Sequence, residues 1–403
     1  MRIPKLTAAL ILLAAITLTG AAPNAEAHQF RNADLGYVVD VPAGWEIAEA
    51  ATPELVSFVD PNGVAVFQVF SFPGDTFDEP EEIEAFIRQQ LGASGDSAPF
   101  VLNGREAVFA DLTFTPGGAE GDQGGTGTDG GPEFRGYYAF VDREDRDYAV
   151  MSFAEVSNYD GYHDFLLTNV DSFAADEEGR FLPGPVSQFY YAYPPPDPVP
   201  QRLDFEGSDV TLDLDAEETE ATQILIEREA RILTAYGVER WGAAGEWVEA
   251  WKRFYRVIYR DNVDRLEGLA TDLEGHFRNA EVPRSEIPAR LLDWLQDFEY
   301  ARTGTLSDLQ SPTSSLMTRT GDCDALALIY IILLHHMDFD AILMVSNQHA
   351  HALAAVDVEG DGARYEYEGT QYLVAELTVD VELGMIHQDM ADPAGWIPVR
   401  MVF

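Results

Sequence analysis

The sequence predicts an α+β protein, and three observations support this class. The first half alternates apolar runs of strand length with turn residues. A stretch rich in proline and tyrosine then leads into a region whose apolar residues recur with the period of a helix. Strand-like alternation returns toward the end of the chain. Helices followed by antiparallel strands are typical of an α+β domain.

The N-terminus has the features of a secretory signal. Arg2 and Lys5 precede an apolar run over residues 6–18, and Ala25-Glu-Ala27 is a small-residue cleavage site. We therefore expect residues 1–27 to be removed and the protein to be exported, either to a periplasm or out of the cell. No later segment reaches the ~20 apolar residues that a membrane helix needs, so no membrane span is expected after cleavage.

The charge limits the class of partner. Among 403 residues the formal net charge is −45, which argues against nucleic acid or an anionic membrane as a ligand. The acidic residues are spread along the chain and do not gather in a tail. Such a surface is typical of a halophilic protein, because salt screens the repulsion between like charges.

Residues 28–177 are predicted to form the first domain. The turn Asp60-Pro-Asn-Gly63 joins two apolar strands and predicts a hairpin. Residues 124–129 match one calcium-binding β-roll repeat, but such repeats bind calcium in tandem, so a flexible loop is favoured. Strands are expected at residues 37–41, 55–59, 64–70, 107–114, 135–141 and 148–153, and helices at 80–91 and 162–173.

The opening of this domain, Tyr37-Val-Val-Asp-Val-Pro-Ala-Gly-Trp45, together with the order of its elements, resembles the PsbP-like fold of secreted and thylakoid proteins. The resemblance covers roughly residues 30–175. It implies an α/β sandwich that serves as a binding or assembly module without catalysis. The residues themselves show no catalytic constellation in this domain.

Residues 178–204 are predicted to be a linker. Their proline run favours extended polyproline structure and a semi-rigid spacer, with a ligand for an aromatic groove as the alternative. The second domain is expected over residues 205–403, with a helical lead-in at 215–300 and a core at 285–403. Within it, helices are predicted at 217–236, around 247–258 and at 285–300, and strands at 341–346, 351–358 and 372–379.

Cys323 is the only cysteine, so it cannot form a disulfide within the chain. It opens the apolar run at residues 325–334, which predicts a buried helix. A thiol in the first turn of a helix faces the positive end of the helix dipole, which favours the thiolate. Cys323 is therefore a candidate nucleophile; the alternative is a small buried core residue.

A catalytic thiol needs a base and a group that orients the base. His335 lies about 18 Å along the helix from Cys323 and is too distant. His349 and His351 are near the start of a predicted strand, and Glu376 lies on the next strand in an apolar context, where pairing with a histidine would offset its burial. The alternative for Glu376 is an edge position facing solvent.

Four segments together resemble the bacterial transglutaminase-like superfamily, which has a papain-like core. They are Ser311-Pro-Thr313, Gly321-Asp-Cys-Asp324, His351-Ala-Leu-Ala-Ala-Val356 and Tyr372-Leu-Val-Ala-Glu-Leu-Thr378. The resemblance covers roughly residues 285–400 and implies a Cys–His–acid triad on a helix and two successive strands.

Transferred to this chain, the resemblance implies that Cys323 is the nucleophile, His351 the base and Glu376 the acid. Gln296 matches the upstream glutamine that helps to form the oxyanion hole in the family. Glu376 stands where many members have aspartate, and His351 is followed by Ala-Leu where the animal enzymes have Ala-Trp. These departures leave the acyl acceptor undefined.

The sequence thus predicts an exported thiol-dependent amide hydrolase or acyltransferase that acts on a protein or peptide and needs no cofactor. One alternative is a non-catalytic binding or scaffold protein that retains the transglutaminase-like core. Another is a metal site built from His349, His351 and Cys323, since residues two apart on a strand can chelate. This last alternative is the least favoured, and no metal is expected.

Overall fold

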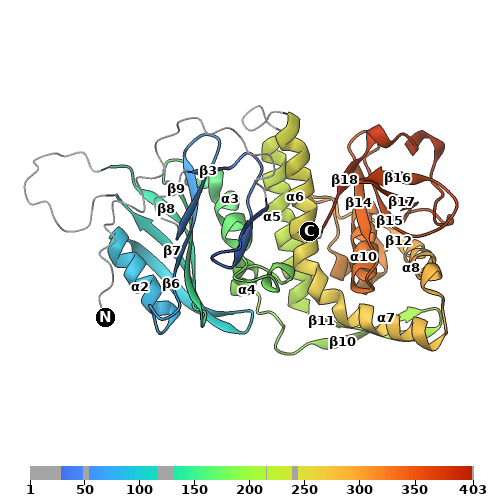
Figure 1. Cartoon of the computed structure of the whole chain (residues 1–403), viewed down its shortest axis with the longest axis horizontal. Helices are drawn as coiled ribbons and strands as arrows, with labels where there is room; N and C mark the ends of the chain where they lie inside the picture. Colours follow the sequence, from blue (N-terminus) through green and yellow to red (C-terminus); the bar gives the residue numbers. More distant parts are fainter. Residues whose placement is uncertain (1–28, 49–53, 117–130, 215, 238–243, 402–403) are drawn as a thin grey trace, which may run out of the picture. The chain divides into compact units, whose positions relative to one another are not determined.

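The computed structural model describes residues 29–48, 54–116, 131–214, 216–237 and 244–401. The predicted signal at residues 1–27 and the β-roll match at 124–129 lie outside these ranges. The chain divides into two compact units (Figure 1). Unit 1 comprises residues 1–193 and 234–250, and unit 2 comprises 194–233 and 251–403.

An antiparallel sheet, seven-stranded in the described part of unit 1, forms the centre of that unit, in the order β3-β4-β5-β9-β8-β7-β6. The turn at Asp60 joins β4 to β5, because its carboxylate accepts the backbone N–H groups of Asn62, Val64 and Ala65. The strands are β3 (Glu46–Ala48), β4 (Leu55–Val59), β5 (Ala65–Pro73), β6 (Ser94–Leu102), β7 (Arg105–Phe114), β8 (Phe134–Val141) and β9 (Arg146–Glu155), and a separate pair is formed by β1 (Gln29–Asn32) and β2 (Tyr37–Asp40).

Two helices cover opposite faces of this sheet (Figure 1). Helix α2 (Pro80–Leu91) buries Ile83 and Ile87 in an apolar cluster with Met151 of β9. Helix α3 (Tyr159–Asp171) packs on the other face, where Asn169 donates to the hydroxyl of Ser152 at 3.2 Å. Because successive residues of β9 point to opposite faces, this alternation produces a layered α/β unit.

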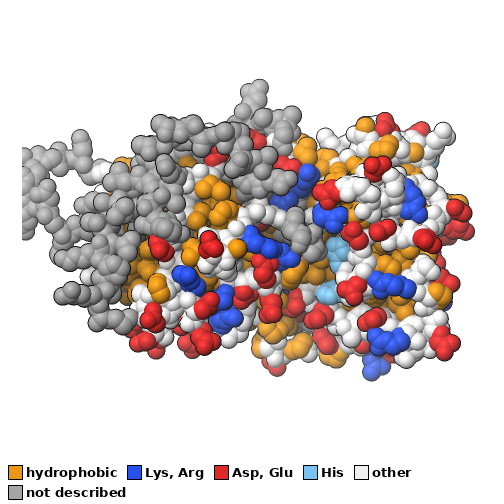
Figure 2. All heavy atoms as spheres, in the orientation of Figure 1, with side chains coloured by type: hydrophobic (Ala, Val, Ile, Leu, Met, Phe, Trp, Pro, Cys, Tyr) orange, Lys and Arg blue, Asp and Glu red, His pale blue; other side chains and the backbone are white. Residues whose placement is uncertain are grey.

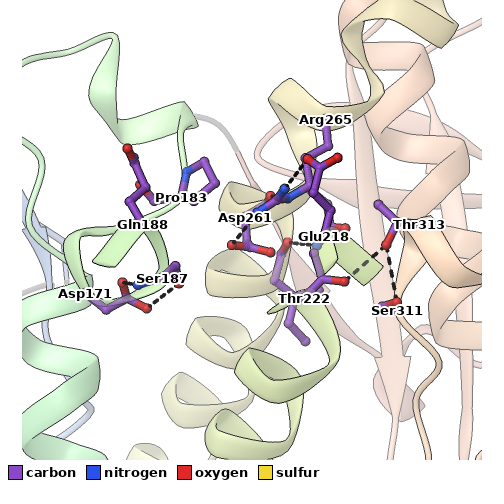
Figure 3. A network of polar contacts seen from close by, with 12 residues as sticks. Asp171, Pro183, Ser187, Gln188, Glu218, Thr222, Asp261, Arg265, Ser311 and Thr313 are labelled. Carbon is purple, nitrogen blue, oxygen red and sulfur yellow. Dashed lines mark hydrogen bonds and ion pairs between the residues drawn. The ribbon is translucent and has the colours of Figure 1, made fainter. Parts of the chain in front are cut away.

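The predicted linker is folded over part of its length. It contains η1 (Gly179–Phe181) and α4 (Pro185–Tyr190), which begins with proline at a position where its missing N–H costs nothing. The Gln188 side chain accepts the N–H of Asn103 at 2.9 Å and donates to the carbonyl of Pro183 (Figure 3). Phe189 stacks on Phe109 at a centroid distance of 4.5 Å. Residues up to 190 therefore belong to folded unit 1, whereas the proline run at residues 194–200 follows them and leads into β10 (Val199–Phe205).

Asp147 makes the stability of unit 1 depend on pH. Its side chain is fully buried in β9, and burial, with the nearby Asp142, raises its pKa to about 7. The unfolded chain releases this proton near pH 4 whereas the folded chain keeps it, so stability falls as pH rises from about 4 to 7. D147N should melt at the same temperature as wild type at pH 4 but about 2–6 °C higher at pH 8.

Thermal melts of the full chain at both pH values test this expectation. D96N is the matched control, because Asp96 is exposed on β6 of the same sheet. A D147N melting temperature that differs from wild type equally at pH 4 and pH 8 would contradict the role assigned to Asp147.

Unit 2 begins with a hairpin and continues with helices. The first turn of α5 is tied to α6 and η2 by buried charges: Arg265 lies 2.6 Å from Glu218 and 3.7 Å from Asp261 (Figure 3). Thr222 of α5 also contacts the hydroxyl of Thr313 at 3.1 Å. The elements are β10 (Val199–Phe205), β11 (Ser208–Leu214), α5 (Ala216–Tyr236), α6 (Ala244–Val263), η2 (Asp264–Leu266), α7 (Glu267–Asn279), η3 (Arg284–Glu286), α8 (Ile287–Gln296) and α9 (Pro312–Thr318), with α5 and α6 contributing residues to both units.

The described part of unit 2 also contains a five-stranded antiparallel sheet, in the order β16-β17-β15-β14-β18. Helix α10 (Cys323–His336) packs against β14 and β15. The strands are β14 (Ala341–Ser346), β15 (His351–Val356), β16 (Arg364–Tyr367), β17 (Thr370–Ala375) and β18 (Ile397–Val399), joined in part by η4 (Gln388–Met390) and η5 (Pro393–Gly395). The predicted α+β class is confirmed.

Acidic side chains are dispersed over the surface. Figure 2 shows aspartate and glutamate scattered across the visible face, with no single acidic patch. Among the described residues, no helix combines the length and apolarity required to cross a bilayer.

Candidate active site

Cys323 is the first residue of α10. Asp322 caps this helix, because its carboxylate accepts the N–H of Ala325 at 2.8 Å. Just before the cap, β13 (Thr320–Gly321) pairs in parallel with β12 (Glu299–Tyr300) and fixes the path of the chain into the helix. The apolar residues that follow Cys323 are buried against the sheet, so the thiol is held at the sheet by the whole helix (Figure 1).

The register of two strands places His351 near Glu376. β15 and β17 are antiparallel, and their last pair toward the site is Ala354 with Ala375. Continuing this register by one residue sets Leu353 opposite Glu376, so His351 and Glu376 point to the same face. Nε2 of His351 lies 2.7 Å from Oε2 of Glu376. The two side chains are largely buried, with 12% and 7% of their surface exposed.

Glu376 is held as a carboxylate. Its other oxygen, Oε1, accepts the hydroxyl of Thr378 at 2.7 Å and the backbone N–H of Thr378 at 2.9 Å. Burial raises the pKa of Glu376, but the hydrogen bonds from His351 and Thr378 outweigh burial and lower the pKa overall. An ionised Glu376 fixes the orientation of the His351 ring, whose Nδ1 makes no hydrogen bond within the described part of the chain.

The surroundings of the Cys323 thiol differ from the expectation of a stabilised thiolate. The residue is only 2% exposed, and Sγ contacts Oδ2 of Asp324 at 3.5 Å. Burial raises the pKa of the thiol, and the negative charges of Asp324 and Asp322 raise it further, whereas the N–H of Ala352 partly offsets both. Removal from water and the carboxylate of Asp324 therefore favour the protonated thiol.

Cys323 nevertheless lies next to the strand that carries the histidine. The backbone N–H of Ala352, the residue that follows His351 on β15, is near enough to the sulfur to lower the pKa of the thiol. Ala352 lies beyond the last β15–β17 pair, and α10 packs against β15. The structure thus brings Cys323, His351 and Glu376 to one end of the sheet, although no hydrogen bond joins Sγ to His351 among the described residues.

Gln296 holds the backbone that carries Glu376. Its Nε2 donates to the carbonyl oxygens of Glu376 and Val381, at 2.8 and 2.9 Å. Both amide hydrogens are therefore used, and none is left for an oxyanion at Cys323. This differs from the oxyanion role that the family resemblance implies for Gln296, and it makes Gln296 a support for Glu376.

His349 lies in the turn before β15, and its ring is tilted against Trp396 at a centroid distance of 5.5 Å. Its backbone N–H donates to the hydroxyl of Ser346 at 3.1 Å. Within the described ranges, no group of three or more His, Cys, Asp or Glu side chains is arranged to hold a metal ion.

Two residues at the site were not singled out from the sequence. Asp324 directly follows Cys323, so its side chain could have been considered from its position alone. Tyr255 donates to Oδ1 of Asp324 at 2.6 Å, but it belongs to the aromatic face of α6, and nothing in its sequence context distinguishes it from the core residues beside it. Only the tertiary contact between α6 and the start of α10 identifies it.

No protein-family model and no curated protein matches the chain. Among solved structures, it is similar to the cyanobacterial PsbP of Synechocystis, at 12% identity and a TM-score of 0.29, over 38% of this chain and 97% of that protein. It is also similar to the Ran-binding protein Mog1p of Saccharomyces cerevisiae, at 10% identity and a TM-score of 0.27, over 38% and 96%. A protein of Bacteroides thetaiotaomicron matches at 8% identity and a TM-score of 0.26, over 85% and 88%. These similarities are too low to assign a family.

Proposed function

We propose that the protein is an exported thiol-dependent acyl-transfer enzyme that cleaves or exchanges an amide bond in a protein or peptide. The single observation that carries the proposal is the buried His351–Glu376 pair at 2.7 Å, one residue before Ala352, whose backbone N–H lowers the pKa of the Cys323 thiol. A thiol at the start of a helix, beside a strand that carries a base paired with an acid, is the arrangement that nucleophilic catalysis by cysteine uses. The resemblance to the transglutaminase-like superfamily supports the same assignment.

The first half of the reaction forms a thioester. Sγ of Cys323 attacks the carbonyl carbon of the substrate while its proton passes to Nδ1 of His351. The carbon–nitrogen bond then breaks, and His351 returns the proton to the leaving amine. Glu376 keeps Nε2 of His351 hydrogen-bonded and balances the positive charge of the imidazolium. Because the thiol is protonated at rest, proton transfer accompanies the attack.

The second half releases the acyl group. Water or an amine attacks the thioester carbon, His351 accepts its proton, and the carbon–sulfur bond breaks as that proton returns to Sγ. The acceptor decides whether the overall reaction is hydrolysis or acyl exchange. Neither half requires a metal or an organic cofactor.

Acylation of Cys323 by p-nitrophenyl acetate tests the proposal. This activated ester needs no specific binding site, and release of p-nitrophenolate gives the rate. Because the chain has one cysteine, peptide mass spectrometry assigns the acetyl group unambiguously. We expect acetylation of Cys323 in the wild type and its loss in C323S. No acetylation of folded wild type at Cys323 would contradict the proposal.

A second candidate is a binding or scaffold protein that keeps the core without catalysis. The observation that favours it is the environment of the thiol, which is 2% exposed and hydrogen-bonded to Asp324. The PsbP-like resemblance of unit 1, whose known relatives are binding or assembly modules, points the same way. Under this alternative, p-nitrophenyl acetate would acetylate the wild type and C323S to the same extent.

A further inference from the structure

The carboxylate of Asp324 lies between the thiol of Cys323 and the hydroxyl of Tyr255. Sγ of Cys323 donates to Oδ2 at 3.5 Å, and the Tyr255 hydroxyl donates to Oδ1 at 2.6 Å. Tyr255 is 3% exposed on α6, so its ring cannot turn away without disturbing the packing of that helix. Asp324 is therefore held on one side by a fixed donor and contacts the sulfur on the other.

We propose that Asp324, oriented by Tyr255, is a positioning residue that keeps the thiol proton of Cys323 directed away from His351 and so restrains the resting nucleophile. The inference rests on the proposed function, because the restraint matters only if Cys323 reacts. A thiol has a single proton, and a proton directed to Asp324 is not directed to Nδ1 of His351. Attack on a substrate then requires the thiol to turn toward His351.

The charges around the sulfur favour the same state. Burial raises the pKa of the Cys323 thiol, and the charge of Asp324 raises it further. Asp322 adds to this effect only where it is ionised, because burial and the nearby Asp324 raise the pKa of Asp322 to about 8. The N–H of Ala352 acts in the opposite sense. The titratable and charged groups that face this region are Asp322 and Asp324 at the start of α10, Tyr255 on α6, His351 and Glu376 on the sheet, and Arg302 and Asp308, which act on Asp322.

The rate of alkylation of Cys323 by iodoacetamide tests the inference, with D324N as the decisive variant. Asparagine has the size of aspartate and can still accept from Tyr255, but it carries no charge and binds the thiol proton less strongly. We expect the alkylation rate of D324N at pH 7.5 to be about tenfold higher than that of wild type, because removal of an adjacent carboxylate increases the thiolate fraction.

D338N is the matched control. It removes the same charge just after the opposite end of α10, where Asp338 is exposed, and should alkylate at the wild-type rate. A D324N rate equal to that of D338N in folded protein would overturn the inference. If D324N does not fold, Y255F decides: the freed carboxylate can turn to solvent, so a faster rate supports the inference and an unchanged rate contradicts it.

The two proposals fail in different ways. Alkylation measures the thiol itself and needs no acyl transfer. Faster alkylation of D324N together with no acetylation by p-nitrophenyl acetate would sustain the restraint by Asp324 and reject catalysis. Acetylation of Cys323 together with an unchanged D324N alkylation rate would sustain catalysis and reject the restraint.

Discussion

Replacing His351 with alanine should slow the acetylation of Cys323 by about 10²- to 10⁴-fold. The thiol is protonated at rest because burial and two aspartates raise its pKa, so the attack depends on a base that takes the proton. His351 is the imidazole whose Nε2 is fixed by Glu376, and its Nδ1 remains for that proton. The initial rate of p-nitrophenolate release, measured for H351A and wild type under the same conditions, checks this expectation.

E376Q provides a graded comparison. Glutamine retains an oxygen for hydrogen bonding but does not balance the imidazolium, so we expect a smaller loss of rate than in H351A. H387A is the matched control, because His387 is exposed on the loop before η4 and lies outside the proposed triad. Equal acetylation rates in H351A and H387A would exclude His351 as the base.

Replacing Arg265 with methionine should lower the free energy of unfolding of unit 2 by about 3–5 kcal/mol. Arg265 is buried between Glu218 and Asp261, and its Nε also donates to the carbonyl of Asp261 at 2.8 Å. Methionine fills much of the same volume, but it leaves the carboxylates of Glu218 and Asp261 buried without this cation. Loss of a cation from a buried cluster of charges costs far more than loss of an exposed ion pair.

Amide hydrogen exchange of peptides from α10, followed by mass spectrometry at increasing urea, reports the unfolding of unit 2 directly. R278M is the matched control: Arg278 on α7 pairs with Glu274 at 3.1 Å, but both side chains are more than half exposed. The R278M substitution should lower the free energy of unfolding by less than about 1 kcal/mol. An R265M loss no larger than that of R278M would show that the buried cluster contributes little.

Periodicity was sufficient to predict the main elements of the candidate site. The apolar run after Cys323 predicted α10, and the alternation around His351 and Glu376 predicted two neighbouring strands. Side chains alternate with a period of two along a strand, so residues that share a face can be named before the register is known. Nε2 of His351 and Oε2 of Glu376 come within 2.7 Å because β15 and β17 pair in this antiparallel register, and no local pattern specifies the register.

The first part of the predicted linker, up to residue 190, is folded as part of unit 1. Proline and tyrosine residues favour a solvated spacer, but Phe189 stacks on Phe109 and Gln188 binds Asn103, contacts that join segments about 80 residues apart in the sequence. In the linker, tertiary contacts outweigh local composition. The hairpin of β10 and β11 was also not anticipated, although its local pattern indicates it: Leu203 and Phe205 alternate with polar residues before the Glu206-Gly207 turn, and Val210, Leu212 and Leu214 do so after it.

The sequence by itself determined the acidic surface, the α+β class and the start of a buried helix at a lone cysteine, because composition and periodicity are local properties. The tertiary structure decided the chemistry around that cysteine. Asp324 accepts hydrogen bonds from the thiol and from Tyr255, and Gln296 donates both of its amide hydrogens to backbone carbonyls at Glu376 and Val381. The protonation of a thiol depends on how much water and which charges surround it, and these are set only when distant segments pack together.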